Sequence, residues 1–189
     1  MNMERYLDKC PIECDSPIEV TNIILEQGLL ERCTGCNQLF SQCTNTEFNS
    51  SMEEFNSEKG TWPPPENVKS LERSTKKTLD NIKKLTNQKL GQLKLLDVGC
   101  SNGAFIFTAS KSGIQCEGIE PAREAALAAK KAGLKVYQGF LEESDFSKES
   151  FDIITLFEVI EHLKNPVELL NTCNRLLKKN GIMVISICF

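Results

Sequence analysis

The stretch from residue 93 to residue 110 sets the strongest limit on how this chain can fold. An apolar run over residues 93–98 leads into the turn D-V-G-C-S-N-G at positions 97–103, and a helical pattern follows over 104–110. A strand that passes through a short turn into a helix is typical of alternating α/β folds. Gly99 and Gly103 let the backbone of this turn approach a ligand closely, because glycine has no side chain. We therefore expect a ligand-binding turn between a strand and a helix.

Short apolar runs and helical patterns alternate through the rest of the chain. The expected strands are 93–98, 115–119, 134–137, 151–157 and 182–189, and the expected helices are 104–110, 123–132 and 166–179. The run 151–157 is almost wholly apolar, which is typical of a strand that is buried on both faces. This alternation predicts an α/β fold: a Rossmann-like, doubly wound and mainly parallel sheet that stops after its fifth strand.

The first half of the chain has a different composition, and we expect three parts. These are a small Cys-rich module over 1–45, a linker and amphipathic helix over 46–90, and the α/β core over 91–189. The three prolines at 63–65 place a connector over 44–65. From Glu66 onward apolar residues recur at three- and four-residue steps, which predicts a helix with Gly91 as its stop.

Charge and apolar content limit the partners of this chain. The formal net charge of the 189 residues is -4, so no general field attracts nucleic acid or an anionic membrane. We see no signal peptide and no apolar stretch long enough to span a bilayer, so we expect a cytoplasmic protein with neither membrane nor nucleic acid as partner. Thiols stay reduced in the cytoplasm, so the nine cysteines need a reason other than disulfides.

The spacing of the glycines in the turn indicates which kind of nucleotide ligand it can bind. Nicotinamide enzymes show G-x-G-x-x-G to admit a pyrophosphate, whereas this turn reads D-x-G-x-x-x-G. It suits a ligand without pyrophosphate, such as an amino-acid sulfonium. The helix N-terminus beyond the turn presents free N–H groups to a carboxylate, and Asp97 can hold an ammonium group or a bridging water.

Two further strand ends carry ligand-binding candidates. Glu120 ends the second strand, 21 residues after Gly99, where an acidic residue can accept hydrogen bonds from both ribose hydroxyls. The alternative is a surface carboxylate that closes a strand. Phe140 follows the third strand, and we weigh it equally as an adenine contact and as a core residue.

Four segments together resemble a known family: LLDVGCSNG, GIEPA, FDIITLFEVIEHLKNP and LLKKNGIMVIS. Over residues 94–187 they are similar to class I S-adenosylmethionine-dependent methyltransferases. The resemblance implies S-adenosylmethionine as cofactor, a small-molecule acceptor such as a sugar or related metabolite, and cofactor contacts from Asp97, Gly99, Gly103, Glu120, Phe157 and Glu158. The predicted cofactor site also includes Cys100, Ser101 and Phe140. Ser101 stands where the family usually has glycine.

His162, the one histidine of the chain, follows the fourth strand in the segment E-V-I-E-H at 158–162. We predict it as the catalytic residue, a general base that takes a proton from a hydroxyl acceptor. One alternative is that it only shapes the floor of the pocket. Another is a divalent cation held with Glu158 and Glu161, since the pattern resembles that of ubiquinone-pathway O-methyltransferases and small-RNA 2′-O-methyltransferases, whose similar residues bind a metal.

Cysteines at the start of the chain form two pairs. Cys10-x3-Cys14 and Cys33-x2-Cys36 are separated by 18 residues, a spacing at which two turns offer four thiolates to a tetrahedral zinc. We predict a structural zinc site at these four residues, with Cys43 as a substitute ligand; the alternative is buried free cysteines. The segment resembles the zinc ribbon that precedes the catalytic domain in some bacterial methyltransferases, including sugar-modifying ones.

The sequence stops at Phe189, within or just after the fifth expected strand. Class I methyltransferases usually carry two more strands, and an unpaired strand edge invites association. We therefore expect either that this chain is truncated relative to its relatives or that a second copy or another partner chain covers the strand edge. The alternative function is a catalytically incomplete cofactor-binding or interaction module that lacks the acceptor-binding strands.

Overall fold

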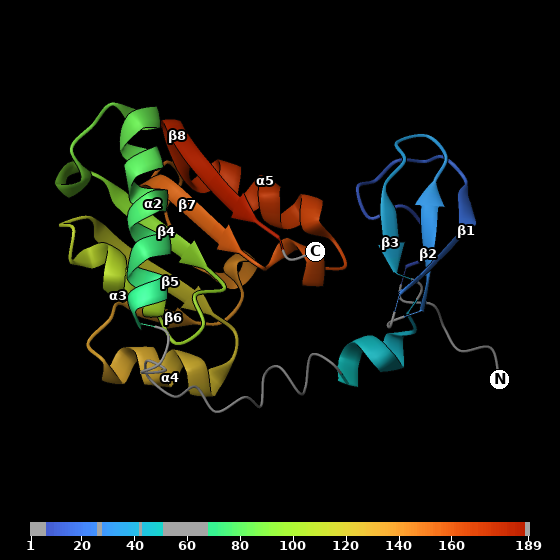
Figure 1. Ribbon diagram of the computed structural model, residues 1–189, viewed down its shortest axis with the longest axis horizontal. Coiled ribbons are helices and arrows are strands. Elements are labelled where there is room, and N and C mark those ends of the chain that lie inside the picture. Colours follow the sequence, from blue (N-terminus) through green and yellow to red (C-terminus); the bar gives the residue numbers. More distant parts are fainter. Residues whose placement is uncertain (1–6, 26–27, 42, 51–67, 188–189) are drawn as a thin grey trace.

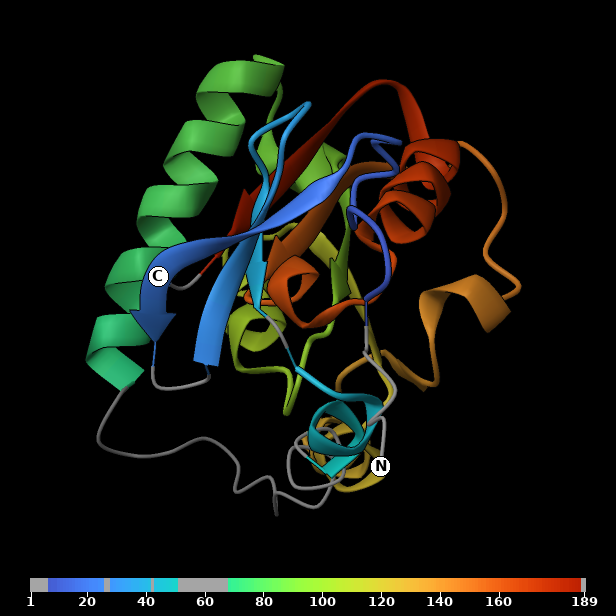
Figure 2. The ribbon, with the colours of Figure 1, turned by 90° about the vertical axis from the view of Figure 1, so that its right-hand side faces the viewer.

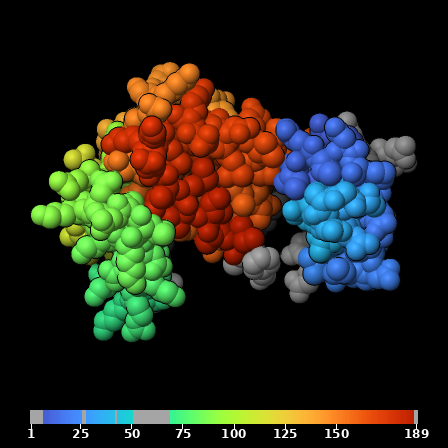
Figure 3. All heavy atoms as spheres, turned by 90° about the horizontal axis from the view of Figure 1, so that it is seen from above, coloured from blue at the N-terminus to red at the C-terminus, as the bar shows by residue number. Residues whose placement is uncertain are grey.

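A computed structural model describes residues 7–25, 28–41, 43–50 and 68–187, which form two separate β-sheets. The smaller, antiparallel sheet is N-terminal and has the order β1-β2-β3, with β1 at Ile18–Leu25, β2 at Gly28–Cys33 and β3 at Leu39–Ser41. Figure 3 shows it as a lobe at one end of the molecule.

The larger sheet has five strands in the order β6-β5-β4-β7-β8, and all neighbours are parallel. Its strands are β4 (Lys94–Val98), β5 (Gln115–Glu120), β6 (Val136–Gln138), β7 (Phe151–Phe157) and β8 (Leu177–Ser186). From the central β4 the chain moves to one side through β5 and β6, and then crosses to β7 and β8 on the other (Figure 1). Open α/β sheets bind ligands at such a switch point, beyond the carboxyl ends of the strands.

Helices cover both faces of the larger sheet. These are α2 (Val68–Thr86), α3 (Ala104–Ser110), α4 (Arg123–Lys131) and α5 (Pro166–Leu176). Leu95 belongs to one core cluster with residues of α2, α3 and α4, whereas its neighbour Leu96 belongs to a second cluster with residues of α5. Figure 2 shows α2 and α5 on opposite sides of the sheet. Strand β4 is thus buried on both faces, because successive side chains of a strand point to opposite faces. The helices on both faces and the parallel strands confirm the predicted Rossmann-like, doubly wound fold.

Two element boundaries differ from the sequence prediction by about five residues. Helix α2 ends at Thr86, because Asn87 takes a left-handed conformation (φ 52°), and Gly91 instead lies in a short 3₁₀ helix. The prediction of Gly91 as the stop was therefore wrong; asparagine is the residue besides glycine that most readily takes this conformation. At the other end, β8 begins directly after α5, because Leu177 already pairs with Phe151.

Residues 45–50 are helical, where the sequence predicted a connector. The signal is a capping box: Thr44 Oγ1 accepts from the Glu47 backbone N–H at 3.2 Å, and Glu47 Oε2 accepts from the Thr44 backbone N–H at 2.8 Å. The rest of the predicted connector, residues 51–65, and the predicted helix start at Glu66 lie outside the described residues. Within the described parts of the chain, no helix combines the length and the apolar character needed to cross a bilayer.

Candidate cofactor site

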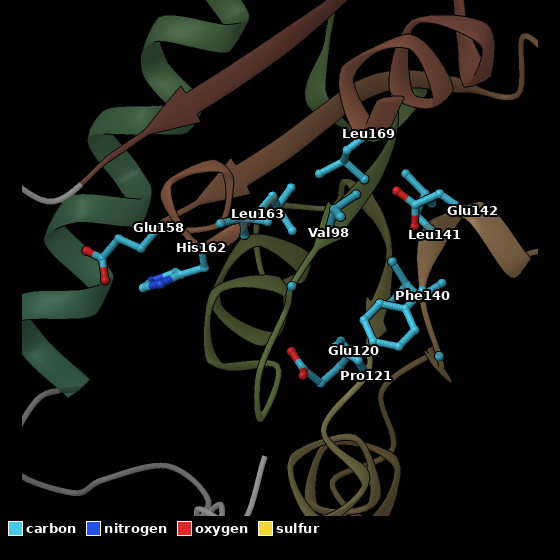
Figure 4. Close-up of a pocket in the computed structure, with 14 residues that line it drawn as sticks. Val98, Glu120, Pro121, Phe140, Leu141, Glu142, Glu158, His162, Leu163 and Leu169 are labelled. Carbon is cyan, nitrogen blue, oxygen red and sulfur yellow. The ribbon is translucent and has the colours of Figure 1, made fainter. Parts of the chain in front are cut away.

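A pocket opens at the carboxyl ends of β4, β5 and β7, at the switch point of the sheet. Five of the residues predicted from the sequence line it together: Gly99, Glu120, Phe140, Glu158 and His162. Figure 4 shows Glu120 and Phe140 on one side of the pocket and Glu158 with His162 on the other. The structure therefore gathers residues from four separate parts of the chain around one space.

The turn after β4 requires both of its glycines. Gly99 has φ 70° and Gly103 has φ 81°, a region that other residues rarely adopt. A Cβ atom at Gly99 would lie 2.7 Å from a methyl group of Val159, and one at Gly103 would lie 2.5 Å from a methyl group of Leu134. Because the N–H groups of Gly99 and Cys100 bond to the Ile119 carbonyl at 2.9 and 3.1 Å, the turn is fastened to β5.

Glu120 is almost fully buried, and both oxygens of its carboxylate are held. The backbone N–H groups of Ser101 and Ala122 each donate to it at 2.7 Å. Burial raises the pKa of this carboxyl, and these two hydrogen bonds oppose the shift. The carboxylate thus faces the pocket in a fixed orientation, with lone pairs left for a ligand diol.

Asp97 lies beneath the turn and is buried, and it does not line the pocket. The hydroxyl of Thr155 donates to its Oδ1 at 2.5 Å. Burial raises the pKa of Asp97 to about 7, although the Thr155 hydrogen bond opposes this, and the nearby Glu120 raises it further. Across the described part of the chain, no lysine, arginine or histidine forms an ion pair with Asp97. The site therefore holds a buried carboxyl group without a cation.

Three other predicted site residues have different surroundings. Cys100 is buried in the core cluster, where a Cβ atom at Gly118 would come within 2.6 Å of its sulfur. Ser101 is exposed and adopts a left-handed conformation with φ 48°. Phe157 does not line the pocket but stacks edge to face on Phe105, with ring centroids 4.8 Å apart. Cys100 and Phe157 therefore act on the site through packing.

Glu158 and His162 lie side by side at the end of β7 and in the short 3₁₀ helix Ile160–His162 (Figure 4). Both side chains are exposed, and Glu158 has a left-handed backbone with φ 56°. The ligand atoms of Glu158, Glu161 and His162 do not all lie within 4.8 Å of one another, so the structure does not bring them together as the cation site considered as an alternative. His162 lines the pocket, where a general base for the acceptor would have to stand.

Sequence reasoning missed most of the pocket wall. Val159, Leu141, Leu163 and Leu169 give the pocket an apolar lining, and Glu142 stands at its rim. In the sequence these apolar residues look the same as core residues. In the structure these four apolar residues belong to or pack against the core cluster that includes α5, and they also line the pocket.

The N-terminal cysteines converge as well. The sulfurs of Cys10, Cys33 and Cys36 all lie within 4.8 Å of one another, and those of Cys10 and Cys36 are 3.6 Å apart. Cys14 lies beside Cys33 but outside this mutual set, and Cys43 is not part of it. Backbone N–H groups of Cys36 and Gly35 hydrogen-bond to the Cys33 thiol and lower its pKa against the effect of burial.

A doubly wound parallel sheet, a glycine turn at its switch point and a carboxylate ending the next strand define a nucleoside-binding α/β domain. Residues 68–188 match the model of a methyltransferase domain family. The chain thus belongs to the class I S-adenosylmethionine-dependent methyltransferase family.

Curated relatives and solved structures agree with this assignment. The chain is 33% identical over 139 residues to a ubiquinone biosynthesis O-methyltransferase of Histophilus somni, covering 68% of this chain and 58% of that protein. It is 36% identical over 102 residues to the protein of the same name from Bradyrhizobium diazoefficiens, covering 51% and 40%. The chain therefore spans less than two thirds of the length of these relatives.

The solved structures share the fold. The MccD protein is 27% identical with a TM-score of 0.52, over 58% of this chain and 52% of that one. Phosphoethanolamine N-methyltransferase 1 of Haemonchus contortus, solved with phosphoethanolamine and S-adenosylhomocysteine, has a TM-score of 0.59 at 12% identity, over 75% and 32%. The second likeness shows the fold alone.

Proposed function

We propose that this chain binds S-adenosylmethionine in the pocket beyond β4 and transfers its methyl group to a hydroxyl group of a small molecule. The observation that carries the proposal is the Glu120 carboxylate, which is buried, held by two backbone N–H groups at 2.7 Å, and directed into a pocket that begins at the glycine turn. A carboxylate fixed in this way can accept hydrogen bonds from both hydroxyls of a ribose.

The two sides of the pocket carry different residues, which supports a separate place for the cofactor and for the acceptor. Glu120 and Phe140 on one side suit the nucleoside, and Glu158 and His162 on the other side suit the acceptor (Figure 4). The sulfonium is an activated donor, so alignment of acceptor, methyl group and sulfur contributes about 7–11 kcal/mol. His162 as general base adds about 10²–10⁴-fold in rate.

The names of the curated relatives favour an oxygen atom as acceptor, since those proteins are O-methyltransferases. They do not point to a sugar, the acceptor class expected from the sequence. We therefore propose a hydroxyl-bearing small molecule without narrowing it to sugars.

Calorimetric titration tests the cofactor. S-adenosylmethionine and S-adenosylhomocysteine should each bind at one site per chain, whereas NAD should not bind, because the turn lacks the spacing for a pyrophosphate. Titrations in which neither sulfur nucleoside binds, or in which NAD binds instead, would overturn the proposal.

We also propose that Cys10, Cys14, Cys33 and Cys36 hold a structural zinc ion in a module that spans residues 1–45. In a tetrahedral site with Zn–S bonds of 2.3 Å, neighbouring sulfurs are about 3.8 Å apart. The observed 3.6 Å between the sulfurs of Cys10 and Cys36 is close to that edge and far from the bond length of a disulfide.

Metal analysis of protein purified without chelator tests the zinc proposal. The wild type should carry about one equivalent of zinc, Cys33→Ser should lose it, and Cys116→Ser in the α/β core should keep it. A wild-type content below about half an equivalent would contradict the proposal.

A further inference from the structure

A polar groove lies between the N-terminal module and the outer side of α5, the helix that faces the module in Figure 1. Its polar lining combines Glu13 of the module with Asn165, Glu168, Asn171, Thr172 and Arg175 of α5 and its N-cap. The α5 positions recur at three- and four-residue steps, so they share one face of the helix. The buried residues Leu169, Cys173 and Leu176 lie on the opposite face. The module therefore meets the outer side of a helix whose inner side belongs to the core.

Glu13 stands in the turn that joins Cys10 and Cys14, two of the proposed zinc ligands. Its backbone is left-handed with φ 58°, and its N–H group donates to the Cys10 carbonyl at 3.0 Å. This conformation costs about 1 kcal/mol for a residue other than glycine. Glycine would therefore suit the turn better if only its shape mattered. The glutamate side chain, which lines the groove, indicates that the carboxylate itself has a role.

The charges on the two sides of the groove are complementary. Arg175 is the one positively charged residue among those that the structure describes around this groove, and Glu13 is the carboxylate that the module contributes. Within the described ranges of the chain, neither of them forms an ion pair with a third residue. Glu168 is engaged on its own helix, because it accepts from Asn165 Nδ2 at 3.3 Å. The carboxylate of Glu13 is thus the natural partner of Arg175.

We propose that the groove is a docking surface for the metal-loaded module, in which Glu13 pairs with Arg175 of α5. This inference rests on the zinc site proposed above. A zinc ion held by Cys10 and Cys14 fixes the turn between them, and with it the place of Glu13. Loading and docking are then coupled, so any change that weakens docking also weakens zinc binding.

The docked module supports a helix that also serves the cofactor pocket. Leu169 lines that pocket from the face of α5 opposite to the groove. The 3₁₀ helix that carries His162 ends four residues before α5 begins. A module docked on the outer face of α5 therefore restrains this part of the pocket wall from behind.

Zinc affinity of the full chain, measured by competition with a chromophoric chelator of known affinity, tests the proposal. Glu13→Gln and Arg175→Gln should each lower the affinity about two- to fivefold, as expected for the loss of one exposed ion pair. The double variant should lose no more than either single variant. Glu19→Gln on β1 and Lys130→Gln on α4 are matched controls at exposed positions and should bind zinc as the wild type does.

The Arg175→Gln variant decides the outcome, because Arg175 lies on α5 of the core and is not one of the proposed zinc ligands. An unchanged zinc affinity in this variant overturns the inference, whatever Glu13→Gln does. Arg175→Lys keeps the charge and should retain most of the affinity. The losses should shrink in 1 M salt, where charges are screened over about 3 Å, and losses that persist undiminished there also overturn the inference.

A second variant keeps the test decisive if Arg175→Gln is poorly folded by circular dichroism. Asn171→Asp offers Arg175 a carboxylate four residues away on the same helix and repels Glu13, so it should lower zinc affinity as well. An unchanged affinity in Asn171→Asp then overturns the inference. A wild type that binds no zinc instead overturns the proposed zinc site, so the two failures are distinguishable.

Discussion

The carboxylate of Glu120 accepts a hydrogen bond from the backbone N–H of Ser101 at 2.7 Å, which joins the end of β5 to the turn that follows β4. Ser101 has the left-handed backbone that this turn imposes (φ 48°). One carboxylate thus serves two purposes: it stabilises a strained turn and it faces the pocket. The two purposes can be separated experimentally.

Glu120→Gln should weaken S-adenosylhomocysteine binding by about 1.5–3 kcal/mol, the usual range for hydrogen bonds to a charged group. The amide has one oxygen in place of two, and its NH₂ group meets a backbone N–H of Ser101 or Ala122. Calorimetry provides the measurement. Glu117→Gln is the matched control, because Glu117 is buried on the same strand but pairs with Lys94 and Lys135. Equal affinities in wild type and Glu120→Gln would refute the ribose role.

Ser101→Gly should stabilise the protein by roughly 0.5 kcal/mol, because glycine adopts the left-handed region without the cost of about 1 kcal/mol borne by other residues. Urea denaturation measures the change. Ser74→Gly, at an exposed position inside helix α2, should have the opposite effect, since glycine weakens the interior of a helix. A destabilised Ser101→Gly variant would show that the serine side chain does more than tolerate the turn.

Asp97→Asn should stabilise the cofactor-free protein near neutral pH and lose this advantage in acid. The folded-state pKa of Asp97, about 7, lies above its unfolded value, so the buried acid lowers stability as pH rises from about 4 to 7. Asparagine does not titrate, so the gap in melting temperature between the variant and the wild type should widen over that range. With a pKa of about 7 in place of the ordinary 3.8, the expected difference in free energy of unfolding at pH 7.5 is about 4 kcal/mol. A gap that is constant with pH would contradict the assignment.

Phe140→Ala should weaken binding of S-adenosylhomocysteine by about 1–3 kcal/mol, the usual contribution of stacking between an aromatic ring and a base. Phe140 lines the pocket and is 52% exposed, which leaves a ring face free for the adenine. Tyr137→Ala is the control, because Tyr137 stacks on Phe146 outside this pocket. Unchanged affinity in Phe140→Ala would show that Phe140 does not contact the adenine.

Much of the fold was predictable because periodicity and glycine position reflect backbone physics directly. The β7 run and the α3 boundaries agree with the sequence expectation, since an almost wholly apolar run and a glycine turn leave few alternatives. The end of α2 was not predictable in the same way, because Asn87 stops the helix by a backbone conformation that asparagine adopts only in some contexts.

The candidate site was predictable where a residue type carries the chemistry, as at Glu120 and His162. It was not predictable at Thr155, which stands within the apolar run F-D-I-I-T-L-F and reads as part of a buried strand. Its significance depends on the register of β4 against β7, and a single sequence does not specify register between strands that are far apart.

The hydrogen bond between Thr155 and Asp97 joins residues 58 positions apart, across strands made at different times during synthesis. At about 5–20 residues per second, β4 leaves the ribosome several seconds before β7. The glycine turn and Glu120 are therefore complete while Asp97 still lacks Thr155, and the wall that carries His162 does not yet exist. A nascent chain can therefore gain no stability from a ligand in this pocket until it has crossed back to the other side of β4.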